Sequence, residues 1–364
     1  MRLIRVWLVI AAVLLLTSVS GWSQQSSGRR KIIIDQDAAG PGGTDQQSIL
    51  LLVQSPQTEV LGVTVVTGDA WLIEIEEVAH TLRMLEIIGR TDIPVVPGAE
   101  YPLVRRKEDT ELWEKQYGYV PWVGAWTPRR YHAADDLGEM PEGKPTTKPA
   151  DEDAAHFLVR IVRKYPHEIT IYEGGPMTNL ALAISIDPEF AGLAKELVFM
   201  GGSLNPKTDD PEFVNTPRHE FNLWFDPEAA HVVLMAPWKK IVCTTVDISV
   251  KTRLTQDLID RVKASNTPAA RYVGSYSHLF GDYNYLWDEL AALSWLDPTL
   301  ITAKETRYLD VDLSRGAGYG NTLSWTERDK PTIVGPPAEV QADLDTEKFY
   351  KMFVDLMTAP TPKP

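Results

Sequence analysis

Three aspartates, Asp35, Asp37 and Asp45, stand in the glycine-rich stretch IIIDQDAAGPGGTDQQSILLL (32–52), between two apolar runs. Side chains on a strand alternate in direction, so Asp35 and Asp37 share a side if the first strand continues through them. The AAGPGGT loop can bring Asp45 back toward the other two. Carboxylate oxygens gathered in this way are the ligands that Ca²⁺ and Mg²⁺ prefer. Taken alone, the stretch fits a solvated acidic loop equally well.

Phosphate chemistry is the main rival interpretation of this stretch. A phosphate-binding P-loop is not supported, because no Gly-Lys-Ser/Thr sequence follows the glycines. Haloacid-dehalogenase-like phosphatases also begin with D-x-D after a strand, but they prefer Thr or Val where Ala39 stands here. A Mg²⁺ phosphohydrolase built on Asp35 and Asp37 stays open as an alternative, and it predicts a lysine near a later strand end.

Short β-rich runs alternate with helical patterns along the chain. Strands are predicted at 31–35, 59–68, 168–175, 196–202 and 240–248, and helices at 71–88, 154–165, 178–184 and 228–235. Such alternation predicts βαβ units and an open, mostly parallel α/β sheet flanked by helices, with a Rossmann-like core. Ligands in these sheets bind outside the carboxyl ends of the strands, where the acidic loops converge.

Composition limits the class of protein. The chain has 364 residues, 44% of them hydrophobic and 24% charged, as expected of a folded globular protein. A formal net charge of −14 argues against binding to nucleic-acid polymers, because phosphate contacts need an excess of lysine and arginine. We expect one domain over 31–357, with an irregular insertion around 103–150 and a disordered tail at 358–364. The single cysteine, Cys243, lies in an apolar run and is predicted to be a core residue.

The N-terminus has the layout of a secretory signal peptide. Arg2 and Arg5 precede the apolar run VWLVIAAVLLLTSV (6–19), and a polar segment follows, so we predict a signal peptide at 1–23 with cleavage after Ser20 or Ser23. An uncleaved anchor is the alternative, but the run is shorter than the roughly 20 residues that span a bilayer. The sequence therefore predicts export to the periplasm or the medium, with no stable membrane span after cleavage.

Six further motifs follow the opening stretch in order. They are VTVVTGD (63–69), GPMTNLALA (175–183), VFMGG (198–202), EFNLWFDPEAA (220–230), DELAALSWLDP (288–298) and ADLDTEKFYKMFVDLM (342–357). Together with the opening stretch they resemble the signatures of the inosine–uridine-preferring nucleoside hydrolase family. The resemblance runs from about residue 31 to 357, and only the 103–150 region matches poorly. It implies a calcium-dependent enzyme that cleaves the N-glycosidic bond of ribonucleosides, acts on a small nucleoside substrate and forms homo-oligomers.

The resemblance also implies roles for individual residues. One Ca²⁺ would lie at the bottom of the pocket, held by Asp37, Asp45, Asp288 and the backbone carbonyl of Gly174. Asp37 would also deprotonate the attacking water, and Asp35 would support it. The substrate-binding residues would be Asp69, Met200, Glu220, Asn222 and Thr44. Candidate contacts to the base are Trp287, His278 and Tyr283.

Three departures from the family pattern bear on the substrate. Thr44 stands where the family has the first of two adjacent aspartates, and a different alignment of the enlarged loop would remove a metal ligand. Asp69 replaces a ribose-binding asparagine. Trp287 replaces a histidine that helps to protonate a purine leaving group. These departures leave open a family member that binds ribose-like ligands without turnover or hydrolyses a non-standard N-riboside.

Overall fold

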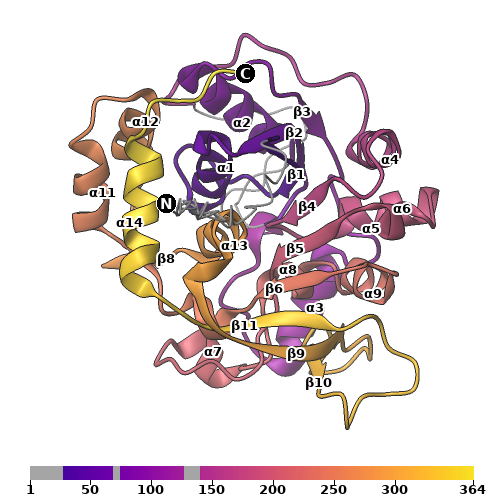
Figure 1. Cartoon of the computed structure of the whole chain (residues 1–364). Helices are drawn as coiled ribbons and strands as arrows, with labels where there is room; N and C mark the ends of the chain where they lie inside the picture. The colour runs from indigo at the N-terminus through magenta and orange to yellow at the C-terminus, as the bar shows by residue number, and fades with distance from the viewer. Residues whose placement is uncertain (1–27, 69–73, 127–139) are drawn as a thin grey trace, which may run out of the picture.

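The computed structural model describes residues 28–68, 74–126 and 140–364. Its strands are β1 (Arg30–Gln36), β2 (Thr58–Val65), β3 (Val95–Pro97), β4 (Thr170–Glu173), β5 (Glu196–Met200), β6 (Ile241–Thr244), β7 (Arg253–Thr255), β8 (Tyr283–Tyr285), β9 (Ile301–Val311), β10 (Thr322–Trp325) and β11 (Ala338–Leu344). Nine of these strands form one sheet in the order β10-β9-β11-β6-β5-β4-β1-β2-β3 (Figure 1). All neighbours from β11 to β3 run parallel, whereas β9 is antiparallel to β11 and β10. The mostly parallel sheet confirms the predicted fold class.

The helices are α1 (Thr44–Gln54), α2 (Glu74–Ile88), α3 (Lys107–Tyr117), α4 (Ala154–Lys164), α5 (Thr178–Ile186), α6 (Phe190–Leu193), α7 (Pro211–Asn215), α8 (Phe221–Phe225), α9 (Pro227–Met235), α10 (Val246–Ser249), α11 (Gln256–Lys263), α12 (Pro268–Tyr276), α13 (Trp287–Leu296) and α14 (Thr346–Thr358), with short 3₁₀ turns η1 (Gly124–Trp126) and η2 (Pro298–Leu300). Strands β7 and β8 form a separate antiparallel pair.

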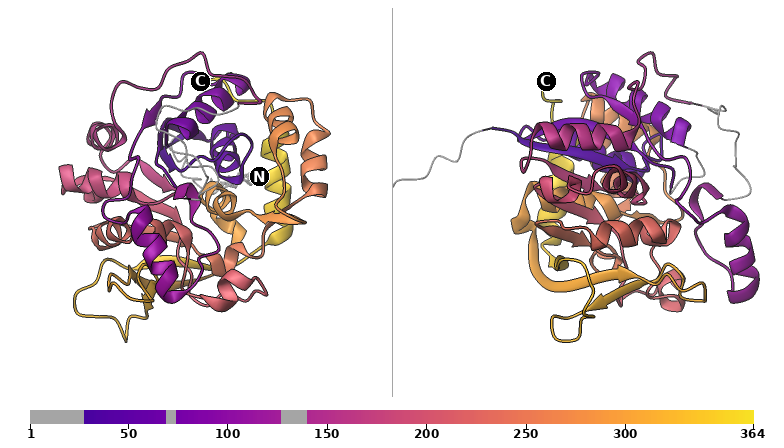
Figure 2. Two further views of the ribbon diagram at one scale, coloured as in Figure 1. Left: turned by 180° about the vertical axis from the view of Figure 1, so that it is seen from behind. Right: turned by 90° about the vertical axis from the view of Figure 1, so that its right-hand side faces the viewer.

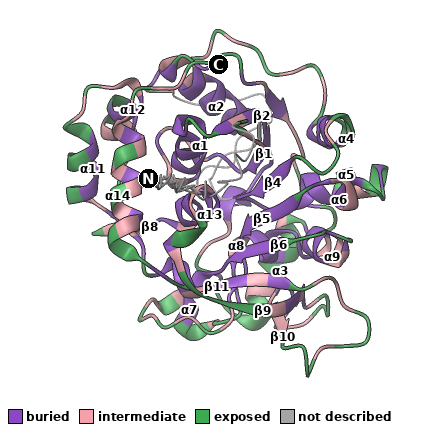
Figure 3. Cartoon of the chain, in the orientation of Figure 1, coloured by how far each residue is buried: buried purple, intermediate pink, exposed green. Residues whose placement is uncertain are grey.

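Alternating side chains of the central strands build a core on each face of the sheet. Ile32 and Ile34 of β1 belong to the core with α1, α2 and α11 to α14, whereas Ile33 belongs to the core with α4, α5, α6 and α9. Figure 1 shows these two helix groups on opposite sides of the sheet. Both faces are covered at the centre of the sheet, so β4, β5 and β6 are entirely buried, whereas much of β9, near the edge, is exposed (Figure 3). Such burial explains why the β1 sequence is a continuous apolar run rather than an alternating one.

Local sequence explains where the principal helices begin and which face they bury. Asp345 caps α14 by accepting from Lys348 N, and Phe349, Phe353 and Met357 follow at helical spacing as its buried face. The helix α13 is different, because its residues 288–295 are all buried. It contacts α1, α14 and β5, and a helix enclosed in this way must be apolar all round apart from residues with a specific role. Asp288 and Glu289 are buried charged residues in this helix, so a specific role is expected of them.

The 103–150 insertion is less irregular than the sequence suggested. It contains the helix α3, which the absence of clean periodicity did not predict, and Figure 2 shows this helix at the edge of the molecule. The sequence analysis predicted a disordered tail at 358–364. Thr358 is the last residue of α14, and residues 359–364 lie outside any helix or strand. Gln54 Nε2 donates to Ala359 O at 2.9 Å, and disorder of the tail stays a prediction. The signal peptide and Asp69 lie outside the described residues. Across the described ranges, no helix is both long enough and apolar enough to cross a bilayer.

Candidate active site

A cavity of about 510 Å³ opens at the carboxyl ends of β1, β4 and β5, on the side of the sheet where ligands of such folds bind. Ten of the residues singled out in the sequence line it, namely Asp37, Thr44, Asp45, Gly174, Met200, Glu220, Asn222, Tyr283, Trp287 and Asp288. They come from segments far apart in the chain, so the sheet and its connections bring them together.

Three carboxylates of the predicted metal site, Asp37, Asp45 and Asp288, line this cavity, and together with Gly174 they are called its floor below. Asp37 follows β1 directly, and Asp45 and Asp288 stand in the first turns of α1 and α13, where the helix dipole favours negative charge. Burial, and after it the nearby Asp37 carboxylate, raises the pKa of Asp288 well above its usual range. Asp288 Oδ2 accepts from Gln36 Nε2 at 3.2 Å, while Asp288 Oδ1 is buried without a hydrogen-bond partner.

Gln36 is a positioning residue that the sequence analysis missed. Its Nε2 donates to Asp288 and to Ser48 Oγ at 3.1 Å, and its Oε1 accepts from Asp37 N at 2.9 Å. A Cβ at position 174 would lie 2.3 Å from Gln36 Nε2, so only glycine lets β4 approach this closely. The signal in the sequence was slight, since a glutamine between two aspartates resembles any polar loop residue.

The floor fits a hard divalent cation by the chemistry of its donors. Three carboxylates and the carbonyl of Gly174 offer only oxygen ligands, and the unpartnered Oδ1 of Asp288 gives a buried lone pair that a cation would satisfy. Within the described ranges, no three Asp, Glu, His or Cys side chains are gathered tightly enough to enclose an ion.

Glu220 and Asn222 stand beside the floor at the start of α8. The Glu220 carboxylate accepts from three backbone N–H groups, those of Gly202 (2.8 Å), Asn222 (2.8 Å) and Leu223 (3.1 Å). Burial raises the pKa of Glu220, and these three donors oppose the rise. Asn222 Nδ2 donates to Gly174 O at 3.1 Å and to Met200 O at 3.2 Å. One amide thereby ties β4, β5 and α8 together at the cavity.

Asp35 lies behind the site rather than in it. It is fully buried and does not line the cavity, and its Oδ1 accepts from Thr64 Oγ1 and from Asn179 Nδ2 at 2.8 Å. The neighbouring Glu173 is also fully buried, and burial together with the Asp35 charge raises the pKa of Glu173 well above its usual range. Glu173 therefore holds the proton of this pair. The sequence analysis did not select Glu173. A glutamate at the end of an apolar strand was the signal that could have indicated a buried carboxyl group there.

The walls of the cavity come from segments outside the sheet. Tyr283, Tyr285 and Trp287 form a row of rings, with centroids 5.2 Å and 4.4 Å apart along it. Phe213 of α7 meets Trp287 edge-on at 5.9 Å. The remaining residues that line the cavity are Pro121, Trp122, Asp210, Glu212, Phe213, Phe221, Val246, Phe280, Asp282, Asn284 and Tyr285. They lie in loops and short elements without a regular period.

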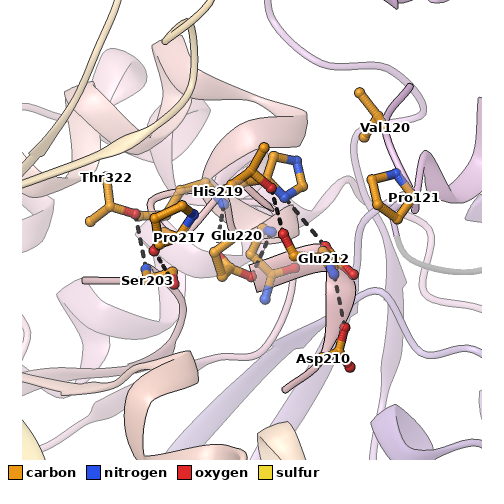
Figure 4. Close-up of polar contacts among 12 residues, drawn as sticks. Val120, Pro121, Ser203, Asp210, Glu212, Pro217, His219, Glu220 and Thr322 are labelled. Atoms are coloured by element: carbon orange, nitrogen blue, oxygen red, sulfur yellow. Dashed lines mark hydrogen bonds and ion pairs between the residues drawn. The ribbon is translucent and has the colours of Figure 1, made fainter. Parts of the chain in front are cut away.

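His278 is not brought to the cavity, contrary to our expectation. It is exposed, lies in the loop between α12 and β8, and packs its ring against Phe280 at 5.1 Å. Sequence proximity to the aromatic stretch was misleading, because the chain turns between His278 and Phe280, which does line the cavity. His219 does not line it either; its Nδ1 lies 3.3 Å from Glu212 Oε1 (Figure 4).

A mostly parallel α/β sheet with an acidic, aromatic-walled cavity at its strand ends defines an enzyme that acts on a small polar substrate. The family model for inosine-uridine preferring nucleoside hydrolases matches residues 32–351. The chain belongs to this family, and it is a hydrolase that acts on N-glycosyl bonds.

Relatives and solved structures agree with this membership. The chain is 30% identical to a probable uridine nucleosidase 2 of Arabidopsis thaliana over 86% of this chain and 94% of that protein. It is 26% identical to the inosine-uridine preferring nucleoside hydrolase of Crithidia fasciculata, over 87% and 95%. A plant nucleoside hydrolase structure superimposes with a TM-score of 0.74 at 26% identity, covering 91% of this chain and 99% of that one.

Proposed function

We propose that the protein is a Ca²⁺-dependent hydrolase that cleaves the N-glycosidic bond of ribonucleosides, giving free base and ribose. The observation that carries the proposal is that Asp37, Asp45, Asp288 and Gly174 line one cavity. A cavity of about 510 Å³ lies within the range of about 300–1,000 Å³ that small-molecule sites occupy. A family that depends on a metal ion supports the same interpretation.

The chain's own residues supply most of the proposed chemistry. Asp37 accepts the proton of the attacking water as a general base, because it stands at the floor with its backbone N–H held by Gln36. Carboxylates around the sugar stabilise the positive charge that develops on the ribose ring as the C1′–N bond breaks. Glu220 and Asn222 bind ribose hydroxyls. When bound, Ca²⁺ would lower the pKa of a coordinated water and orient the 2′- and 3′-hydroxyls.

The phosphohydrolase alternative finds no support at this site. Within the described residues, no lysine or arginine lines the cavity, although phosphate binding depends on such side chains. Binding of a ribose-like ligand without turnover is the remaining rival, and Trp287, which lines the cavity, is the observation that keeps it open.

A nucleoside panel tests the proposal. The mature protein, stripped with EDTA and then supplied with Ca²⁺, Mg²⁺ or neither, is incubated with purine and pyrimidine ribosides, and released reducing sugar is measured. We expect release with Ca²⁺ and at least a tenfold loss without it. Calcium binding without release from any riboside would overturn the hydrolase proposal in favour of the binding alternative. Full activity after EDTA treatment would overturn the metal assignment.

A further inference from the structure

Every charged side chain that lines the cavity, within the described part of the chain, is acidic. Beyond the floor and Glu220, three carboxylates stand on the walls: Asp210, Glu212 and Asp282. Asp210 caps α7 by accepting from Glu212 N at 3.0 Å, and Glu212 pairs with His219, as Figure 4 shows. A cleft lined by one sign of charge focuses the field, so this one attracts cations and repels anions.

The walls between these carboxylates are aromatic. Tyr283, Tyr285 and Trp287 present a continuous row of rings, and Phe213 closes it at one end. Faces of such rings attract cations through their negative quadrupole. One contact of this kind already exists, because the guanidinium carbon of Arg253, which does not line the cavity, lies 4.0 Å from the Tyr283 ring centroid.

A proton donor for a leaving base is scarce along these walls. No histidine, lysine or cysteine is found among the described lining residues. Tyr285 carries a hydroxyl, but burial, and then its hydrogen bond with Tyr283, raises its pKa to about 12. A neutral purine or pyrimidine leaves as an anion unless an acid protonates it, so this cavity is poorly equipped for neutral nucleosides.

We propose that the preferred substrates of this site are cationic N-ribosides, in which ribose is joined to a positively charged heteroaromatic nitrogen, as in an N-ribosylpyridinium or a 7-methylpurine riboside. The inference rests on the proposed function and adds the substrate class. Acidic walls select the charge, and the aromatic row stacks on the flat ring.

The chemistry balances without an acid. The C1′–N bond breaks and its electron pair returns to the ring nitrogen, so the cationic ring leaves as a neutral molecule. Water oxygen forms the new bond to C1′, and Asp37 takes the water's proton. The products are ribose, the neutral heterocycle and one proton.

Matched substrates test the inference directly. The probes are the N-riboside of nicotinamide as the cation, with uridine and inosine as neutral substrates, and kcat/KM is measured for each. Cationic ribosides break more readily by themselves, so the decisive quantity is the ratio of cationic to neutral kcat/KM in a variant relative to the same ratio in the unmodified enzyme.

The variants are Asp282→Asn and Glu212→Gln, with the exposed Asp151→Asn, which is outside the cavity, as the matched control. We expect the ratio to fall at least fivefold in each wall variant and at least twentyfold in the double variant, mainly through KM for the cations. The control should leave the ratio unchanged. An unchanged ratio in the double variant would overturn the inference. A higher kcat/KM of the unmodified enzyme for inosine or uridine than for the cationic riboside would overturn it too.

Binding separates failure of the inference from failure of the proposed function. If no riboside is hydrolysed, calorimetric titration still decides the charge preference. The probes are 1-methylnicotinamide, a cation methylated on the ring nitrogen, and nicotinamide, its neutral counterpart. Tighter binding of the cation that is lost in the double variant supports the inference even without turnover. Equal binding of the two probes overturns it. Hydrolysis of neutral nucleosides alone sinks the inference and leaves the proposed function standing.

Discussion

At the residue scale, Asp37, Asp45 and Asp288 line the cavity, and Thr44 stands where the resemblance implies a further aspartate. Thr44 lines the cavity in the place of the missing one. The Oδ1 atom of Asp288 is buried and has no hydrogen-bond partner, so this oxygen is available to a cation. The donor set of three carboxylates and one carbonyl leaves room for water and sugar hydroxyls.

Asp37→Asn should abolish turnover. An amide cannot take a proton from water, and loss of a general base costs about 10²–10⁴-fold in rate. The measurement is kcat on the best riboside of the panel, together with calcium binding and circular dichroism. The exposed Asp151→Asn is the control of matched charge change. If the Asp37 variant kept full activity, the base would have to be another residue.

Glu173→Gln should stabilise the protein at neutral pH. The folded-state pKa of Glu173 is raised by burial, so the contribution of Glu173 to the free energy of unfolding is most favourable below its unfolded pKa of about 4.5 and is lost as pH rises through the folded pKa. Glutamine removes this titration and can still donate to Asp35 and accept from Gly175 N. The variant should be more stable than the unmodified protein at pH 7, and the difference should be close to zero at pH 4.

Thermal unfolding of the two proteins across pH 4 to 8 measures this difference. The melting temperature of the variant should exceed that of the unmodified protein increasingly as pH rises. A constant offset across the range would show that Glu173 does not hold the proton.

At the scale of elements, the site depends on how closely strand ends approach one another. The loop after β2 passes Asp37 at Gly68, where a Cβ would lie 2.2 Å from Asp37 Oδ2 and 2.7 Å from Pro176 Cδ. The loop after β4 crowds the same place, since a Cβ at Gly175 would lie 2.9 Å from Asp37 N. The proposed base is thus held between two glycine-containing loops.

Gly68→Ala should therefore impair catalysis more than folding. The added methyl group displaces the Asp37 carboxylate, and a shift of about 1 Å in a reacting group can cost about a hundredfold in rate. We expect kcat to fall at least tenfold while the far-ultraviolet spectrum is kept. Gly316→Ala is the control, because a Cβ there meets nothing within 4 Å. Equal activity of both variants would show that the Asp37 position tolerates the loop shift.

At the scale of the whole molecule, we propose that the chain is exported and that its first 20 or 23 residues are removed. Expression in a Gram-negative host, followed by fractionation and intact-mass measurement, should find a periplasmic protein that begins at Gly21 or Gln24. Leu15→Arg, which interrupts the apolar run, should leave uncleaved precursor in the cytoplasm. A full-length protein in the membrane fraction would favour the anchor instead. The homo-oligomeric state implied by the resemblance stays a prediction.

The sequence by itself determined the fold class, the family and most of the floor. Strand and helix periods are local properties, and motifs such as EFN and GPMTN keep their spacing because they turn tightly at strand ends. The three floor carboxylates could be selected from these motifs, Asp37 directly after a strand and Asp45 and Asp288 at the starts of helices.

Only the tertiary structure decided which other residues meet at the cavity. Gln36 donates a hydrogen bond to Asp288, which lies 252 residues away in the sequence, and no local pattern records that contact. The acidic wall at Asp210, Glu212 and Asp282 likewise comes from short loops whose position depends on packing. For His278, nearness in sequence to the aromatic stretch predicted a place at the site. In the structure the chain turns before Phe280, and His278 is exposed and does not line the cavity.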